Sequence, residues 1–212
     1  MDTITNIAGR RGGGRGKLLD AAMTLIRTKG YADTTVDDLC RAAGVTKGAF
    51  FHHFRSKEEL GVAATGHFGA MAAGVFAAAP FASLTDPLDR LLGYIDFRRE
   101  ILAGDIADFT CLLGTMVQET YATHPALRDA CAAEMLGHAA TLEADVAAAM
   151  AATGRSFGFS AASLARHTQG VLQGAFVLAK AGGGPDLAVE SVDHLRNYVL
   201  LLLAPERAGQ DG

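Results

Sequence analysis

The sequence predicts an all-α protein with an N-terminal helix-turn-helix followed by a larger helical C-terminal domain. Alanine and leucine are abundant, half of the 212 residues are apolar, and no stretch shows the alternation of a strand. The five prolines fall between the periodic segments, where they can begin a helix or follow its end. We expect about nine helices, at residues 15–29, 36–43, 47–53, 57–78, 87–103, 106–123, 126–152, 161–181 and 187–203.

The first predicted helix has one apolar face, which Leu18, Ala22, Leu25 and Ile26 form at i, i+4, i+7 and i+8. Gly30 follows this face and fits the position just after a helix end, where a glycine is common. The periodic pattern therefore predicts an amphipathic helix that ends before residue 30 and buries one side.

A second and a third short helix follow within about twenty residues. Thr34 or Thr35 can cap the N-terminus of the second helix, and Thr46 can cap that of the third. Gly44 lies between these helices and can form a tight turn. Two short helices joined by a glycine turn make the helix-turn-helix pattern.

The third predicted helix has two distinct faces. Phe50 and Phe54, at i and i+4, belong to the core, whereas Lys47 and Phe51 point elsewhere and have Gly48 beside them. A lysine, an outward aromatic ring and a glycine that allows close approach suit a surface that enters a groove of DNA.

The charge distribution agrees with a polyanionic partner for the N-terminal part only. The formal net charge of the whole chain is −4, but residues 1–57 contain ten Lys/Arg and five Asp/Glu, whereas residues 58–212 contain nine and eighteen. A basic N-terminal part joined to an acidic remainder favours nucleic-acid binding by the former.

Two flanking features can add contacts with such a partner. Ser56 can cap a fourth helix, so that Lys57 and the backbone N–H groups meet a phosphate. Arg10, Arg11 and Arg15 surround a run of glycines and either enter a minor groove or belong to a tail with only diffuse attraction. The sequence leaves these two alternatives for the arginines open.

The first sixty residues resemble a known family. TTVDDL at residues 34–39, AAGVTKGAFFHHF at residues 42–54 and SKEEL at residues 56–60 closely resemble the TetR family of transcriptional regulators. The resemblance covers residues 15–60 almost without gaps. One departure is Phe51, which stands where the family commonly has Tyr, so that a phosphate-directed hydroxyl is lost while the ring remains.

This resemblance implies an all-α homodimer that acts as a repressor on palindromic double-stranded operator DNA. It implies a flexible basic arm at 1–14, a DNA-binding domain at 15–60, a ligand-binding and dimerisation domain at 61–204 and a tail at 205–212. The DNA-contacting residues carried over by position are Thr35, Thr46, Lys47, Gly48, Phe51, His53 and Lys57.

The C-terminal domain is expected to bind an effector and to form the dimer. By resemblance the last two long helices pair with their copies across a twofold axis, although their composition would equally allow an intramolecular core. Large, adaptable side chains of the middle helices suit the lining of an apolar effector pocket, and each would also suit ordinary core packing. The candidates are Phe68, Met71, Tyr94, Phe97, Phe109 and Met116.

Cys111 and Lys180 are further candidates for effector sensing. The segment at residues 110–115 and the segment at 124–128 resemble a subgroup of the family that includes regulators of electrophile-detoxifying reductases. This resemblance implies a thiol-reactive effector at Cys111, with Lys180 as a functional amine. The alternative is that Cys111 is an inert packing residue and Lys180 a solvated lysine, and we expect Cys40 and Cys131 to be packing residues.

Other function classes find little support in the sequence. Three cysteines and seven scattered histidines match neither a disulfide framework nor a metal site, so that we expect no cofactor and a cytoplasmic protein. GRSFG at residues 154–158 satisfies G-x-S-x-G but has no strand before it, so that we expect no enzyme. No secretory signal or membrane partner is expected. The alternative function is a small-molecule-binding or enzymatic helical protein that keeps the helix-turn-helix with only weak, nonspecific DNA binding.

Overall fold

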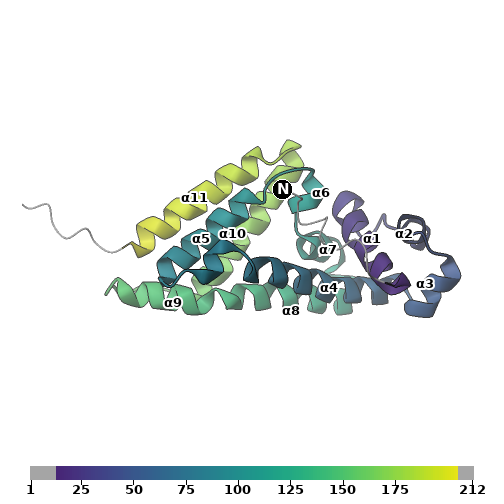
Figure 1. The fold of residues 1–212 in the computed structure, drawn as a ribbon, viewed down its shortest axis with the longest axis horizontal. Helices are drawn as coiled ribbons and strands as arrows, with labels where there is room; N and C mark the ends of the chain where they lie inside the picture. The colour runs from purple at the N-terminus through teal and green to yellow at the C-terminus, as the bar shows by residue number, and fades with distance from the viewer. Residues whose placement is uncertain (1–12, 205–212) are drawn as a thin grey trace, which may run out of the picture. The chain divides into compact units, whose positions relative to one another are not determined.

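The computed structural model describes residues 13–204 and confirms the predicted all-α class, with no strand among those residues (Figure 1). The N-terminal arm up to residue 12 and the tail from residue 205 lie outside the described part. The helices are α1 Gly14–Lys29, α2 Val36–Ala43, α3 Lys47–His53, α4 Lys57–Ala77, the 3-10 helix η2 Pro80–Ser83, α5 Pro87–Glu100, α6 Ile106–Phe109, α7 Leu112–Thr120, α8 Pro125–Thr141, α9 Glu143–Ala152, α10 Ala161–Gly182 and α11 Asp186–Leu203.

Two of the expected helices are each divided in two. The helix expected at 106–123 is interrupted because Thr110 and Cys111 have extended backbone conformations, with ψ of 157° and 124°. The helix expected at 126–152 is interrupted at Leu142, whose N–H bonds to the carbonyl of Ala139 instead of continuing the α-helical ladder. Neither interruption contains proline or glycine, so that no local pattern predicts a break at either place.

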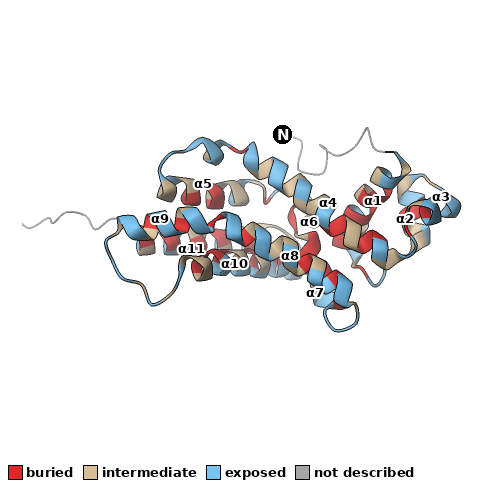
Figure 2. Ribbon diagram, turned by 90° about the horizontal axis from the view of Figure 1, so that it is seen from below, coloured by how far each residue is buried: buried red, intermediate tan, exposed pale blue. Residues whose placement is uncertain are grey.

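The chain forms two compact units. The first consists of the residues up to Val75 together with Ala103–Gly137, and it therefore combines α1, α2, α3 and most of α4 with α6, α7 and most of α8. Its core is continuous across these segments, because side chains of the helix-turn-helix and of α7 and α8 belong to one buried cluster. Fully buried members of that cluster are Leu18, Leu39, Phe50, Leu60, Leu112, Met116 and Leu127 (buried residues are red in Figure 2).

The second unit consists of Phe76–Leu102 and the residues from His138 onwards. In it α10 packs along α11, and α5 packs on α9 and α11. Buried aliphatic residues such as Ile95, Val146 and Leu172 fill its core. Ion pairs join α5 to the neighbouring helices of this unit: Arg90 with Asp145, Arg99 with Asp193 and Asp96 with Arg196.

The helix α4 is long and apolar enough to cross a membrane by length and composition alone. Core helices pass the same test, and the first turns of α4 have this character, because Leu60 and Ala64 are fully buried in the core of the first unit. The remainder of α4 is rich in alanine and glycine. Of the most apolar 18-residue stretch of α4, 22% is buried.

Two glycines of α4 give a matched test of core packing. A methyl group added at Gly61 would lie 2.8 Å from Leu127 Cδ2, 3.2 Å from the Tyr31 ring and 3.4 Å from Met116 Cε, whereas one added at Gly74 would meet nothing within 4 Å. Gly61→Ala should lower the free energy of unfolding by about 1–3 kcal/mol through overpacking. Gly74→Ala should raise it by up to ~1 kcal/mol, because alanine favours a helix interior over glycine. Urea denaturation followed by circular dichroism measures both, and equal effects would contradict the packing described for α4.

Candidate DNA-binding interface

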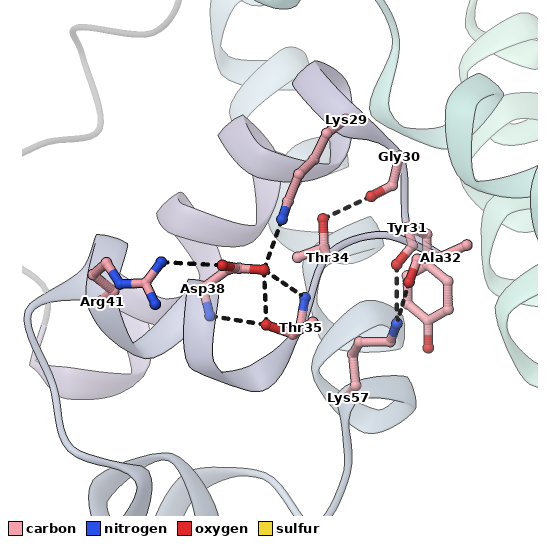
Figure 3. Close-up of polar contacts among 9 residues, drawn as sticks. All are labelled: Lys29, Gly30, Tyr31, Ala32, Thr34, Thr35, Asp38, Arg41 and Lys57. Carbon is pink, nitrogen blue, oxygen red and sulfur yellow. Dashed lines mark hydrogen bonds and ion pairs between the residues drawn. The ribbon is translucent and has the colours of Figure 1, made fainter.

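The N-terminus of α2 is held by a reciprocal pair of hydrogen bonds between Thr35 and Asp38. The Asp38 N–H donates to Thr35 Oγ1 at 3.1 Å, and the Thr35 N–H donates to Asp38 Oδ2 at 3.1 Å (Figure 3). Thr35 is thus the cap among the two threonines considered, and Thr34 is buried and donates to the Gly30 carbonyl at 2.6 Å. This arrangement satisfies backbone donors that a helix start otherwise leaves free.

Asp38 also anchors two cations from neighbouring segments. Lys29 Nζ lies 2.6 Å from Asp38 Oδ2, and Arg41 Nη1 lies 3.2 Å from Oδ1. The hydrogen bond from Lys29 and those from Thr35 hold the pKa of the Asp38 carboxyl well below its usual range. One carboxylate therefore ties the end of α1 to the start of α2.

The turn between α2 and α3 fixes the direction of α3. Gly44 has φ of +64°, in the left-handed region that glycine adopts without a steric penalty, and its N–H bonds back to the Arg41 carbonyl. Thr46 then caps α3 by accepting a hydrogen bond from the Ala49 N–H at 3.1 Å. Both features agree with the predicted pattern.

The two predicted faces of α3 are present. Phe50 and Phe54 are buried, with exposed fractions of 0% and 2%, whereas Phe51 is 56% exposed and packs edge-to-face on Phe50. Lys47 and Gly48 are also exposed, and a methyl group added at Gly48 would meet only Thr46 Oγ1, at 3.7 Å. This outward surface of Lys47, Gly48 and Phe51 is called the α3 face.

The ammonium of Lys47 on the α3 face has an exposed partner. Lys47 Nζ lies 2.9 Å from Asp37 Oδ1, and the hydrogen bond to this carboxylate raises the pKa of Lys47. Because both side chains are largely exposed, the pair contributes little to stability and costs little to exchange for a phosphate.

Two of the other expected contact residues have internal partners. The Lys57 ammonium donates to the Tyr31 carbonyl at 3.0 Å and the Ala32 carbonyl at 3.3 Å, and it lies 4.3 Å from the centre of the Tyr31 ring (Figure 3). Burial lowers the pKa of Lys57. His53 is half-buried against the first turn of α1, since a methyl group added at Gly14 would lie 2.9 Å from its Nε2. For Lys57 to reach a phosphate, it would have to exchange these bonds.

Of the arm arginines, only Arg15 lies in the described part of the chain, in the first turn of α1. Its side chain is exposed, and its guanidinium carbon lies 5.3 Å from the centre of the Phe54 ring. Arg10 and Arg11 lie outside the described residues.

A buried arginine links α1 to α6. Arg27 is only 5% exposed, its Nε donates to the Met23 carbonyl at 2.9 Å, and its Nη1 donates to the Asp108 carbonyl at 3.3 Å. Burial lowers the pKa of Arg27, and the negative charge of Asp108 opposes that shift. Sequence reasoning missed Arg27, because an arginine beside an apolar helical face is usually exposed.

A second link joins the turn after α1 to α7. Glu119 Oε2 accepts a hydrogen bond from the Ala32 N–H at 2.8 Å, and the Tyr31 ring packs edge-on against His124. Neither Glu119 nor His124 has a sequence pattern that predicts this contact, because the turn and α7 are separated by 87 residues. The helix-turn-helix is therefore tied to α6 and α7 by polar contacts as well as by the shared core.

The candidate effector residues are divided between the two units. Phe68, Met71, Phe109, Cys111 and Met116 belong to the first unit, where Phe109 and Met116 are buried and the other three are half-buried. Tyr94, Phe97 and Lys180 belong to the second unit, in which Lys180 is exposed near the end of α10. The candidate effector residues therefore form one group of five in the first unit and one group of three in the second.

Comparison with protein families decides the affiliation of the chain. The family described as "Bacterial regulatory proteins, tetR family" matches residues 18–64, and that described as "Tetracyclin repressor-like, C-terminal domain" matches residues 87–195. The chain belongs to the TetR family of transcriptional regulators. The first match contains the capped turn and the α3 face, and the second extends over most of the C-terminal helices.

Curated transcriptional regulators are similar to this chain over part of their length. The transcriptional repressor KstR2 of Mycobacterium tuberculosis is 41% identical over 57 residues, which are 27% of this chain and 28% of the relative. The transcriptional regulator AcuR of Cereibacter sphaeroides is 31% identical over 102 residues, 48% of this chain and 47% of the relative. The chain thus matches between about a quarter and a half of the length of these relatives.

Solved TetR-family structures share the fold over most of the chain. A regulator from Agrobacterium tumefaciens has a TM-score of 0.76 at 22% identity and covers 87% of this chain and 96% of its own. The reduced form of Escherichia coli NemR has a TM-score of 0.74 at 22% identity, with 87% and 95% covered. At such identities the likeness shows the fold alone.

Replacement of Asp38 tests the anchor at the start of α2. Because its pKa is lowered in the folded protein, the carboxylate stabilises the fold above its unfolded pKa, and this stabilisation is lost as the pH falls through the folded value. Asp38→Asn should therefore unfold at a lower urea concentration than the parent at pH 7, and the difference should shrink as the pH falls below about 4. A difference that stays constant between pH 7 and pH 3 would contradict the anchoring role.

Proposed function

We propose that this TetR-family protein is a homodimeric repressor that binds palindromic operator DNA and leaves it when an effector binds or modifies the protein. Residues 15–60 form the DNA-binding domain, and residues 61–204 bind the effector and form the dimer. The observation that carries the proposal is the α3 face, where Lys47, Gly48 and an exposed phenylalanine follow a capped turn. Such a helix fits the major groove of DNA.

Each residue of this surface has a chemical role in the proposal. Lys47 exchanges Asp37 for a phosphate, and Gly48 allows the backbone of α3 to approach the DNA closely. Phe51 contacts a thymine methyl group, since its ring has no hydroxyl to donate. Thr35 and Thr46 cap helices, and their exposed positions allow phosphate contact, as does the partly exposed His53. Lys57 positions the turn after α1, and the N–H groups at the start of α4 bind phosphate.

The dimer in this proposal forms through α10 and α11. Both helices leave large apolar side chains exposed, which is the feature expected of a surface that pairs with a second copy. These exposed residues are Val177, Leu178, Leu187, Tyr198, Leu200 and Leu201. A twofold axis through this surface would hold two α3 faces at a fixed spacing, as a palindrome requires.

The proposed trigger for release of DNA is modification of the Cys111 thiol by a thiol-reactive effector. Cys111 is half-buried, whereas Cys40 and Cys131 are buried, and burial raises the pKa of the Cys131 thiol to about 12. Cys111 is therefore the one thiol of the three that a reagent can reach without opening the core. Modification of Cys111 would disturb the hydrogen bond by which Arg27 links α1 to α6. Lys180 remains the candidate functional amine of the second unit.

The alternative class, a binding or enzymatic protein with a residual helix-turn-helix, is not favoured. The relatives are transcriptional regulators. Residues 13–204 contain no group of three or more His, Cys, Asp or Glu side chains that could hold a metal ion. A protein of that class would bind all DNA sequences with similar affinity, whereas a repressor binds its operator more tightly than other DNA.

Substitutions on the α3 face test the proposed operator binding. On an operator fragment selected from genomic DNA, Lys47→Ala and Phe51→Ala should each weaken binding about tenfold or more. Lys47→Ala should also reduce the slope of log affinity against log salt by about 1, because one phosphate contact is lost. Fluorescence anisotropy measures both quantities.

Arg128→Ala is the matched control, because it removes the same charge from an exposed position on α8, outside the α3 face and the proposed dimer helices. It should leave operator affinity within about twofold of the parent. If Lys47→Ala and Phe51→Ala bind the operator as tightly as Arg128→Ala does, the proposed α3 face is wrong.

Cys111→Ser tests the thiol part of the proposal. Hypochlorite or methylglyoxal should release the parent protein from its operator, and Cys111→Ser should stay bound at the same dose, because its hydroxyl is far less nucleophilic than a thiolate. Cys131→Ser serves as the control and should be released like the parent. Undiminished release of Cys111→Ser would show that another group reacts.

A further inference from the structure

The second unit contains a dense group of aromatic side chains where α5 meets the end of α4, η2 and α10. Phe76 lies with its ring centre 5.6 Å from that of Tyr94 and 5.9 Å from that of Phe97, and Phe81 lies 5.7 Å and 5.8 Å from the same two rings. We call Phe76, Phe81, Tyr94 and Phe97 the aromatic cluster. It includes two of the side chains expected to line an effector pocket.

A chain of hydrogen bonds ends on a histidine beside this cluster. Gln169 Nε2 donates to Tyr94 Oη at 2.7 Å, so that the Tyr94 hydroxyl proton is directed to His138 Nε2 at 2.9 Å. His138 therefore accepts at Nε2 and carries its proton on Nδ1. Burial and the charge of Arg98 lower the pKa of His138 to about 4, which keeps the ring neutral at pH 7. Its ring lies 4.9 Å from Phe76 and leaves the Nδ1–H group as a donor at the edge of the cluster.

A guanidinium lies against the same rings. The guanidinium carbon of Arg98 is 5.3 Å from the centre of Phe76, 5.5 Å from that of Phe176 and 6.0 Å from that of Tyr94. The neighbouring Arg99 has an ion pair with Asp193, but no described residue places a carboxylate within ion-pairing distance of Arg98. The Arg98 side chain is half-buried.

Arg98 and His138 make this edge of the cluster rich in donors. Both groups contact the Phe76 ring, and the described residues supply no acceptor to Arg98 or to His138 Nδ1. The Arg98 nitrogens and His138 Nδ1 are not fully buried, because the one fully buried polar side-chain atom without a partner among residues 13–204 is Thr110 Oγ1. A ligand that supplies two acceptor oxygens and a negative charge would complement these donors, and an apolar body would lie on the rings.

We infer that this edge of the aromatic cluster binds a small organic carboxylate with an aromatic body, whose oxygens are held by Arg98 and the His138 Nδ1–H group. The inference rests on the proposed function, in which this carboxylate is the effector. The helix α4 gives a covalent route for its effect, since it contributes Phe76 to the cluster and Leu60 to the core of the first unit. The effector must favour the state that does not bind DNA, since only differential affinity shifts the equilibrium.

Fluorine NMR with 4-fluorobenzoate tests the site on the full chain without DNA. The probe's resonance should broaden on addition of protein, and 4-fluorobenzamide, which has the same shape without the charge, should bind at least tenfold more weakly. Arg98→Met should weaken 4-fluorobenzoate binding at least tenfold, Arg98→Lys should restore part of it, and Arg99→Met should match the parent. Circular dichroism melts establish that each variant is folded.

Several outcomes would overturn the inference: no binding of 4-fluorobenzoate, equal binding of the amide, or equal binding by folded Arg98→Met. The effector role is measured separately, as release of an operator fragment by the same probe. If the protein selects no operator, the proposed function fails while the NMR titration still decides the site. If the probe binds and the operator stays bound, the carboxylate site stands and its regulatory role is wrong.

Discussion

A single apolar core joins the helix-turn-helix to α7 and α8, and the other functional features of the first unit depend on it. Phe50 of α3 and Leu60 of α4 are fully buried in the same cluster as Leu112 and Leu127. Because protein interiors are close-packed, α3 cannot turn freely on this core without displacing α7 and α8. The direction of the α3 face is thus set by helices that come more than fifty residues later in the chain.

Polar contacts add specific links between the helix-turn-helix and the helices α6 and α7. Arg27 joins α1 to α6, and Glu119 joins the turn after α1 to α7, each through a hydrogen bond to backbone. A buried cation that loses its acceptor is costly, so that a shift of α6 or a charge change near Cys111 would bear on α1 directly. Lys57 stabilises the same turn, because its ammonium donates hydrogen bonds to two backbone carbonyls there. Contact of this ammonium with a phosphate would require those bonds to be exchanged.

The sequence predicted the local features of the helix-turn-helix well and the long-range features poorly. A cap at Thr34 or Thr35, the cap at Thr46, the turn at Gly44 and the two faces of α3 follow from propensities within four residues, and the structure then selects Thr35. Arg27, Glu119 and the Tyr94–His138 pair depend on residues that are 44 to 87 positions apart, and no local pattern encodes them. The break at Thr110 and Cys111 was missed for the same reason, because neither residue ends a helix by its own preference.

Binding of a palindrome by two α3 faces can be measured by hydroxyl-radical footprinting on DNA fragments that the protein selects from a genome. We expect two protected segments with related sequences in opposite orientation. Their centres should lie about one helical turn of DNA, or a small multiple of it, apart, because two α3 faces of one dimer enter major grooves on the same side of the duplex. Protection spread evenly along every fragment, with no shared sequence among those selected, would contradict this mode of binding.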